Sequence, residues 1–191
     1  MQTHRARDTQ SVWSIDPAKT TVEFTVKNLI FLTVRGSFGD AAGTLRLEPD
    51  DIGRSAVEVV IKAASIATGM KRRDAHLRSA DFLAADRYPD IRFRSTRVEP
   101  GTDRDTLRIT GLLTIRETSG PVVLDVNEVD QSRSPSGEEV VYYNATTELD
   151  RFEFAIKHFP GLIGRSLRIA INLQATRRIG SDTTVTWSNK L

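Results

Sequence analysis

The chain has 191 residues, of which 39% are hydrophobic and 27% are charged, and its formal net charge is +2. This size and composition are typical of one soluble globular domain that can bury a core without cross-links. The lack of cysteine excludes disulfide bonds, thiol nucleophiles and thiolate metal sites. No stretch approaches the roughly 20 apolar residues of a transmembrane helix. Basic and acidic side chains are mixed along the chain, so we expect no nucleic-acid partner.

Alternation of apolar and polar residues is the dominant pattern along the chain. In the segment Thr21–Lys27, for example, Val22, Phe24 and Val26 would share one face and polar side chains the other. Such alternation predicts a half-buried strand. The strands predicted in this way are Thr21–Lys27, Thr44–Glu48, Ala56–Lys62, Ile91–Ser95, Leu107–Ile115, Val122–Val126, Val140–Leu149 and Leu167–Ala175.

Glycine and proline between these segments predict the turns of a mainly antiparallel β protein. About eight strands in one domain favour a closed barrel, because closure removes exposed sheet edges. A two-sheet sandwich fits the same periodicity and stays open at this point. The predicted turns are Gly36, Gly39–Gly43, Glu48–Gly53, Pro100–Gly101, Ser132–Gly137 and Pro160–Gly164.

One segment, Thr68–Pro89, interrupts the alternation and predicts a short helical insert. Thr68 is placed to cap a helix over Met70–Leu77, and Ser79 to cap a second turn over Ala80–Ala84. On a mainly β protein we expect this insert to lie across the mouth of the barrel.

The sequence contains little that indicates catalysis or metal binding. Its three histidines, His4, His76 and His158, are far apart, and neither HExxH, GxSxG nor a P-loop occurs, so we expect no metal site. Asp74 and His76 are the one candidate acid/base pair, for a hydrolase or isomerase. We expect instead that Asp74 contacts an arginine or a helix N-terminus and that His76 packs locally.

Two consecutive motifs carry a resemblance to a known family. Residues 73–82 read RDAHLRSADF and residues 88–96 read YPDIRFRST, shortly after SIATG at 65–69. Together they resemble the YceI-like family of polyisoprenoid-binding proteins. The resemblance extends over residues 11–176 through Trp13–Pro17, Val34–Phe38, Gly111–Ile115 and Asn144–Phe154.

The resemblance implies a lipocalin-like antiparallel β-barrel of about eight strands whose pocket takes a long isoprenoid chain. It implies one domain over residues 11–176 and no enzymatic activity or cofactor. Because residues 1–10 and 177–191 are polar, we expect them to be flexible tails. The partner would be a polyisoprenoid or isoprenoid quinone. A homodimer stays open as the oligomeric state. Lys19-Thr20 and Lys27-Asn28 depart from histidine-bearing positions of the family.

Many relatives are periplasmic, but residues 1–10 lack the apolar segment of a signal peptide. We therefore expect the chain as given to be cytoplasmic.

If the interior is a cavity, the inward-facing strand positions would line it. Phe31, Leu32, Met70, Leu77 and Phe82 would line its entrance. We expect Asp74, His76 and Arg78 to be structural and to hold the helical insert on the barrel. The remaining candidates for the lining are Phe24, Val26, Phe38, Leu47, Val59, Ile61, Phe93, Leu113, Ile115, Leu124, Ile169 and Ile171.

The alternation of apolar and polar residues does not distinguish a barrel filled by its side chains from a barrel with a cavity. A stress or interaction module with a side-chain-filled barrel and an arginine-rich outer face is therefore an alternative. A small hydrolase or isomerase using Asp74 and His76 is a further one.

Overall fold

The computed structural model describes residues 11–28, 32–103, 106–135 and 137–178. In these residues each of the eight predicted strands is present, and β1, β3 and β6 are additional. The helix α1 spans Lys71–Arg78, and three short 3-10 helices span Pro17–Lys19, Ile52–Arg54 and Ala63–Ser65. The strands are β1 (Ser11–Ile15), β2 (Thr21–Asn28), β3 (Thr33–Phe38), β4 (Ala41–Leu47), β5 (Ala56–Lys62), β6 (Ile66–Ala67), β7 (Asp90–Pro100), β8 (Thr106–Ile115), β9 (Thr118–Arg133), β10 (Glu138–Asp150) and β11 (Ile163–Arg178).

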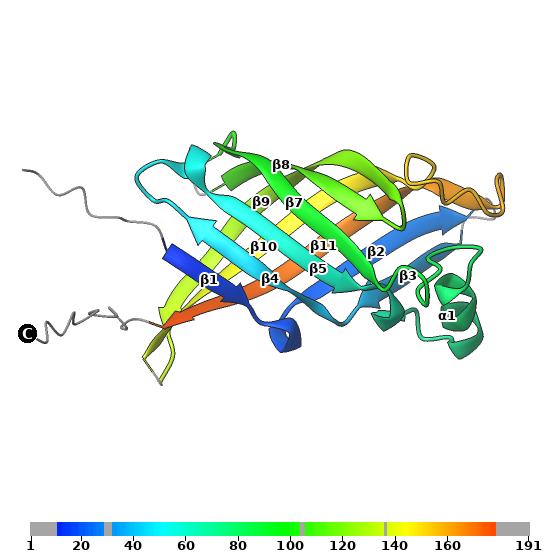
Figure 1. The fold of residues 1–191 in the computed structure, drawn as a ribbon, viewed down its shortest axis with the longest axis horizontal. Coiled ribbons are helices and arrows are strands. Elements are labelled where there is room, and N and C mark those ends of the chain that lie inside the picture. The colour runs from blue at the N-terminus through cyan, green and yellow to red at the C-terminus, as the bar shows by residue number, and fades with distance from the viewer. Residues whose placement is uncertain (1–10, 29–31, 104–105, 136, 179–191) are drawn as a thin grey trace, which may run out of the picture.

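The sheet closes on itself. Its order runs β1-β4-β5-β7-β8-β9-β10-β11, and β11 pairs again with β1, so eight strands of the described chain form a ring (Figure 1). All named neighbours are antiparallel, and β2, β3 and β6 extend the wall from β11. The barrel is therefore confirmed, and the sandwich is excluded.

The period of two places alternate side chains inside the barrel. In β1, Ser11, Trp13 and Ile15 are buried while Val12 and Ser14 are exposed. The buried apolar side chains of all the long strands form one continuous cluster inside the ring. This arrangement follows from the pleat, because successive side chains of a strand point to opposite faces of a sheet.

Three of the predicted turn glycines, Gly36, Gly43 and Gly164, lie inside strands instead. Gly36 is in β3, directly opposite Phe24 of β2, whose ring occupies the space that a side chain at residue 36 would need. Gly43 in β4 and Gly164 in β11 leave room for backbone oxygens of the neighbouring strands, those of Glu58 and Lys27. The turn prediction was wrong at these positions because a glycine in a strand also marks a close approach of neighbouring atoms.

Gly111 of β8 allows a further close approach and gives a prediction. The ring of Phe93 lies where a side chain at residue 111 would begin, so Gly111→Ala is expected to lower the free energy of unfolding by about 1–3 kcal/mol through overpacking. Urea denaturation measures the change. Gly39→Ala is the control, since no atom lies within 4 Å of the added group and stability should stay equal or rise slightly. Equal stabilities of the two variants would contradict this packing.

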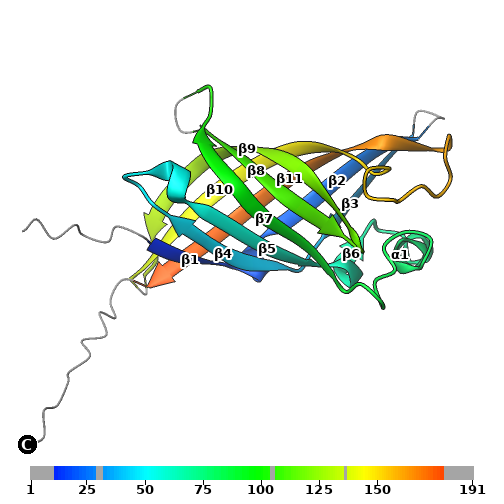
Figure 2. The same ribbon diagram turned by 45° about the horizontal axis from the view of Figure 1, so that its top comes forward.

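The helical insert lies at one end of the barrel, which we call the α1 end; β1 begins at the opposite end (Figures 1 and 2). The helix begins at Lys71, and residues 80–83 form turns, so the predicted second helical segment was wrong. Ala84 has a φ of 47°, which is outside the helical range. Among the described residues, no helix is long and apolar enough to cross a membrane.

Candidate functional site

The interior of the barrel contains a cavity of about 460 Å³. This volume is within the roughly 300–1,000 Å³ range of small-molecule sites. Its wall is almost entirely aliphatic and aromatic, with contributions from β2 to β11 and α1. The polar residues in the wall are Thr20, Arg73, His76, Tyr143, Thr147 and Arg151.

Most of the predicted lining residues do line this cavity. They alternate along their strands, and the closed sheet turns their common face inward. Those found in the wall are Phe24, Val26, Phe38, Leu47, Val59, Ile61, Leu77, Phe82, Phe93, Leu113, Ile115, Leu124, Ile169 and Ile171.

Two predicted entrance residues lie elsewhere. Leu32 and Met70 are 59% and 56% exposed and are not part of the cavity wall. Leu32 precedes the first residue of β3, and Met70 precedes the first turn of α1, so neither position has its direction set by a paired strand. Phe31 lies outside the described residues.

The cavity wall also contains residues that the sequence did not single out. Val57 and Ile109 belong to alternating segments, and their inward-facing positions in those segments could have placed them in the predicted wall. Phe154, Ile156 and Phe159 come from the loop between β10 and β11, which has no periodic pattern. They reach the cavity because this loop folds over the α1 end of the barrel (Figure 1).

Asp74 fastens α1 to the segment that precedes it. Its Oδ1 accepts hydrogen bonds from the backbone N–H and the hydroxyl of Thr68, at 2.8 and 2.5 Å. Arg73 donates to the same hydroxyl oxygen from Nε at 2.7 Å. Thr68 is therefore a donor to Asp74 rather than the helix cap predicted from the sequence; the N-cap residue is Met70, without a side-chain hydrogen bond.

Arg78 makes a second connection at the other end of α1. Its Nε and Nη2 donate to the carbonyl oxygens of Ala64 and Ile66, at 2.8 and 2.9 Å. Asp74 and Arg78 thus hold both ends of α1 to residues 64–68, beside the barrel mouth.

The Asp74 carboxylate gives a pH-dependent prediction. The hydrogen bond from the Thr68 hydroxyl lowers the pKa of Asp74 below its usual 3.8, and burial opposes this in part. A lowered pKa stabilises the fold above 3.8, and this contribution disappears as pH falls through the folded-state pKa. Asp74→Asn should therefore unfold at a lower temperature than the parent protein at neutral pH, and the difference should shrink in acid.

Thermal melts of the two proteins over a pH series measure this difference. Asp86→Asn changes an exposed carboxyl of the same segment and should melt like the parent protein throughout. A deficit for Asp74→Asn that is the same at neutral and strongly acidic pH would contradict the role of the charge.

His76 does not pair with Asp74, so the candidate acid/base pair is not formed. Its Nε2 is 3.0 Å from Oδ2 of Asp81, and its ring packs edge-on against Phe82 with centroids 5.1 Å apart. His158 also approaches Asp81, with Nε2 3.7 Å from the same oxygen. His76 and His158, which are far apart in the sequence, therefore lie close together in the fold. His4 lies outside the described residues.

Arg151 organises the loop over the α1 end. Its side chain is buried, and its guanidinium donates to the backbone carbonyls of Ile156 and His158 in the loop and of Ile163 and Gly164 at the start of β11, at 2.7–3.0 Å. Burial lowers the pKa of Arg151, and the neighbouring Asp150 carboxylate opposes that shift.

Polar groups also lie toward the opposite end of the cavity. The hydroxyl of Tyr143 donates to Oε2 of Glu128 at 3.2 Å, and burial, together with this carboxylate, raises the pKa of Tyr143. Thr20 is buried, and its hydroxyl oxygen has no hydrogen-bond partner among the described residues. Both residues are in the cavity wall, so a polar group inside the barrel has potential partners there.

Comparisons with known proteins place this barrel among its relatives. Residues 13–175 match the family described as the YceI-like domain. The chain is 31% identical over 157 residues to Protein YceI of Shigella flexneri, covering 82% of this chain and 81% of that protein.

Two solved structures share the fold. The crystal structure of Burkholderia cenocepacia BcnA aligns with a TM-score of 0.75 at 19% identity, over 84% of this chain and 98% of BcnA. A polyisoprenoid binding domain from Saccharophagus degradans aligns with a TM-score of 0.62 at 13% identity, over 85% and 97% of the two chains.

Proposed function

Because the chain belongs to the YceI-like family, we propose that its barrel binds a long isoprenoid lipid and sequesters or carries it without catalysing a reaction. The ligand class is a polyisoprenoid or an isoprenoid quinone. The observation that carries this proposal is the apolar cavity of about 460 Å³ inside the closed sheet. The Saccharophagus degradans domain of the same fold, which is described as polyisoprenoid-binding, supports the ligand class.

The physical chemistry of the wall suits such a ligand. Burying one methylene group contributes about 0.8 kcal/mol, so a chain of many apolar carbons gains enough to offset its lost freedom. An apolar chain needs an apolar surface around it rather than directed hydrogen bonds. The wall provides such a surface, with aromatic rings such as Phe24, Phe38 and Phe93 among aliphatic side chains.

The alternative of a side-chain-filled interaction module does not account for this cavity. A filled barrel would bring the inward side chains into contact across the axis. The alternative of a hydrolase or isomerase has no specific support either, since Asp74 is hydrogen-bonded to Thr68 and His76 lies beside Asp81.

Calorimetric titration of delipidated protein with isoprenoid quinones of increasing tail length tests the proposal. Affinity should rise with each added isoprene unit until the tail fills the cavity and should then level off. The same head group without a tail is the control and should bind weakly or not at all. Affinity that does not depend on tail length, or an absence of binding to every quinone, would overturn the proposal.

A further inference from the structure

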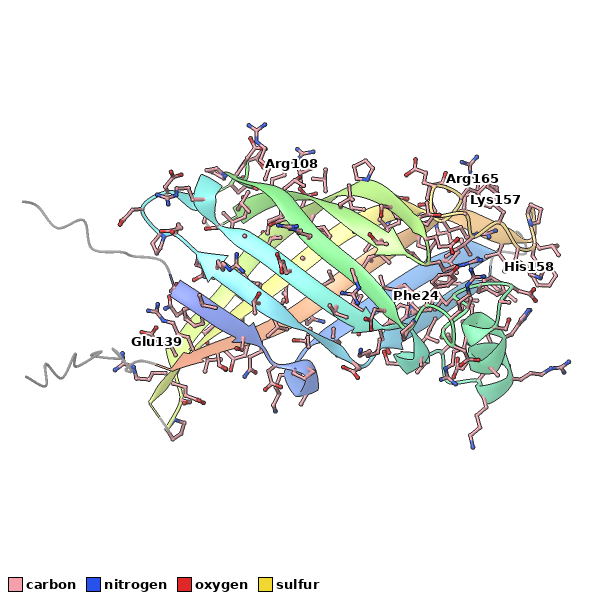
Figure 3. All side chains as sticks on the ribbon, viewed as in Figure 1. Phe24, Arg108, Glu139, Lys157, His158 and Arg165 are labelled. Carbon is pink, nitrogen blue, oxygen red and sulfur yellow. The ribbon has the colours of Figure 1, made fainter. Side chains whose placement is uncertain are left out.

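Three metal-ligating side chains converge at the α1 end of the barrel. His76, Asp81 and His158 each place one ligand atom within 4.8 Å of those of the other two. They come from α1, from the turn that follows it and from the loop between β10 and β11, so the fold alone brings them together. Figure 3 labels His158 at this end, beside the helical insert.

We propose that His76, Asp81 and His158 form a binding site for a divalent transition-metal ion of the zinc class. Two imidazoles and one carboxylate are a ligand set that zinc accepts, with three protein ligands and a fourth position left for water or another oxygen donor. The site is independent of the proposed lipid-binding function.

The spacing of the donor atoms fits a single ion. Around a tetrahedral zinc with bonds of about 2.0–2.1 Å, two ligand atoms are about 3.3 Å apart. The observed separations from Asp81 Oδ2 are 3.0 Å to His76 Nε2 and 3.7 Å to His158 Nε2, on either side of that value. The ligand atoms of the two imidazoles lie within 4.8 Å of each other, so they would approach by at most about 1.5 Å to reach the tetrahedral spacing.

The imidazole rings are held in place by packing. The His76 ring is edge-on to Phe82, and the His158 ring is edge-on to Phe159 with centroids 4.2 Å apart. The backbone on each side is also fixed, because Arg78 holds α1 and Arg151 binds the carbonyl of His158 at 2.9 Å. Such support reduces the reorganisation needed when an ion binds.

The three side chains remain open to an ion from solution. Their exposed fractions are 42% for His76, 50% for Asp81 and 35% for His158. His76 and the neighbouring Phe159 also belong to the cavity wall, so the site lies at the edge of the cavity. A bound ion would therefore add positive charge at the mouth of an otherwise apolar chamber.

Calorimetric titration of chelator-treated protein with Zn²⁺, in the absence of lipid, tests the site. One ion per chain is expected in the parent protein. His158→Gln and Asp81→Asn should each weaken binding by more than the roughly 10–100-fold that follows loss of a group hydrogen-bonded to a metal ligand. Asp86→Asn, an exposed carboxyl of the same segment, is the matched control and should bind Zn²⁺ like the parent protein.

Co²⁺ provides a second readout, because its visible absorption reports ligand type and geometry. Bands of a four-coordinate nitrogen–oxygen site should appear in the parent protein and in Asp86→Asn and be lost in His158→Gln. Circular dichroism checks that each variant is folded. Because His158→Gln and Asp81→Asn are chemically different, the proposal can still be tested with one of them if the other misfolds. Absence of Zn²⁺ binding by the parent protein, or unchanged binding in a folded site variant, would overturn the proposal.

Discussion

Replacing Ala145 by phenylalanine is expected to weaken binding of a long isoprenoid by at least about tenfold while the barrel stays folded. Ala145 is a buried residue of β10 whose side chain lines the cavity, between Val126 of β9 and Ile171 of β11. A phenyl group there would extend into the lumen and occupy volume that the tail needs. Exclusion of only two methylenes, at about 0.8 kcal/mol each, already corresponds to about tenfold in affinity.

The neighbouring residue supplies the matched control. Asn144 is exposed on the outer face of the same strand, so Asn144→Phe adds the same ring outside the cavity and should leave affinity unchanged. Titration with one long-tailed quinone compares the two variants, and circular dichroism checks their folding. Equal affinities in folded Ala145→Phe and Asn144→Phe would show that the lipid does not enter the lumen.

Replacing Arg151 by methionine should have the largest effect on stability. Methionine keeps part of the apolar stem but removes the donors for four carbonyl oxygens, two in the loop over the α1 end and two at the start of β11. Leaving buried carbonyls without partners costs about 1–3 kcal/mol for each group that cannot reach water. With some rearrangement of the loop, we expect a loss of about 3–5 kcal/mol in the free energy of unfolding.

Equilibrium urea unfolding measures this loss. Arg94→Met is the control, since Arg94 is 79% exposed and its ion pair with Glu58, at 3.4 Å, is at the surface. Surface pairs contribute about 0–1 kcal/mol, so this variant should unfold almost like the parent protein. Similar losses in the free energy of unfolding of the two variants would contradict the proposal that the hydrogen bonds of Arg151 stabilise the loop.

The strands and their inward faces were predictable because both depend on local alternation. Phe24 and Ile169 line the cavity because alternate residues of a strand share one face of the sheet, and the closed sheet turns that face inward. The strand β6 was missed because its two residues are extended only through pairing with β3, at Ser37 and Phe38. No pattern of its own marks such a strand.

The polar contacts at the α1 end of the barrel were not predictable in the same way. His76 and His158 are distant in sequence, and only the fold places both beside Asp81. The role of Arg151 likewise depends on where the loop carbonyls lie in space, which no spacing of residues reveals. Thr68 and Asp74 were noticed, but their direction of hydrogen bonding depends on the turn before α1.

Native mass spectrometry of the gently purified protein, with organic extraction of the same sample, tests most directly whether the barrel holds an isoprenoid lipid. A bound mass is expected that the extract identifies as a polyisoprenoid or isoprenoid quinone, and Ala145→Phe prepared in parallel should carry less of it. Repeated preparations without any isoprenoid, and without uptake of an added long-tailed quinone, would contradict the proposal.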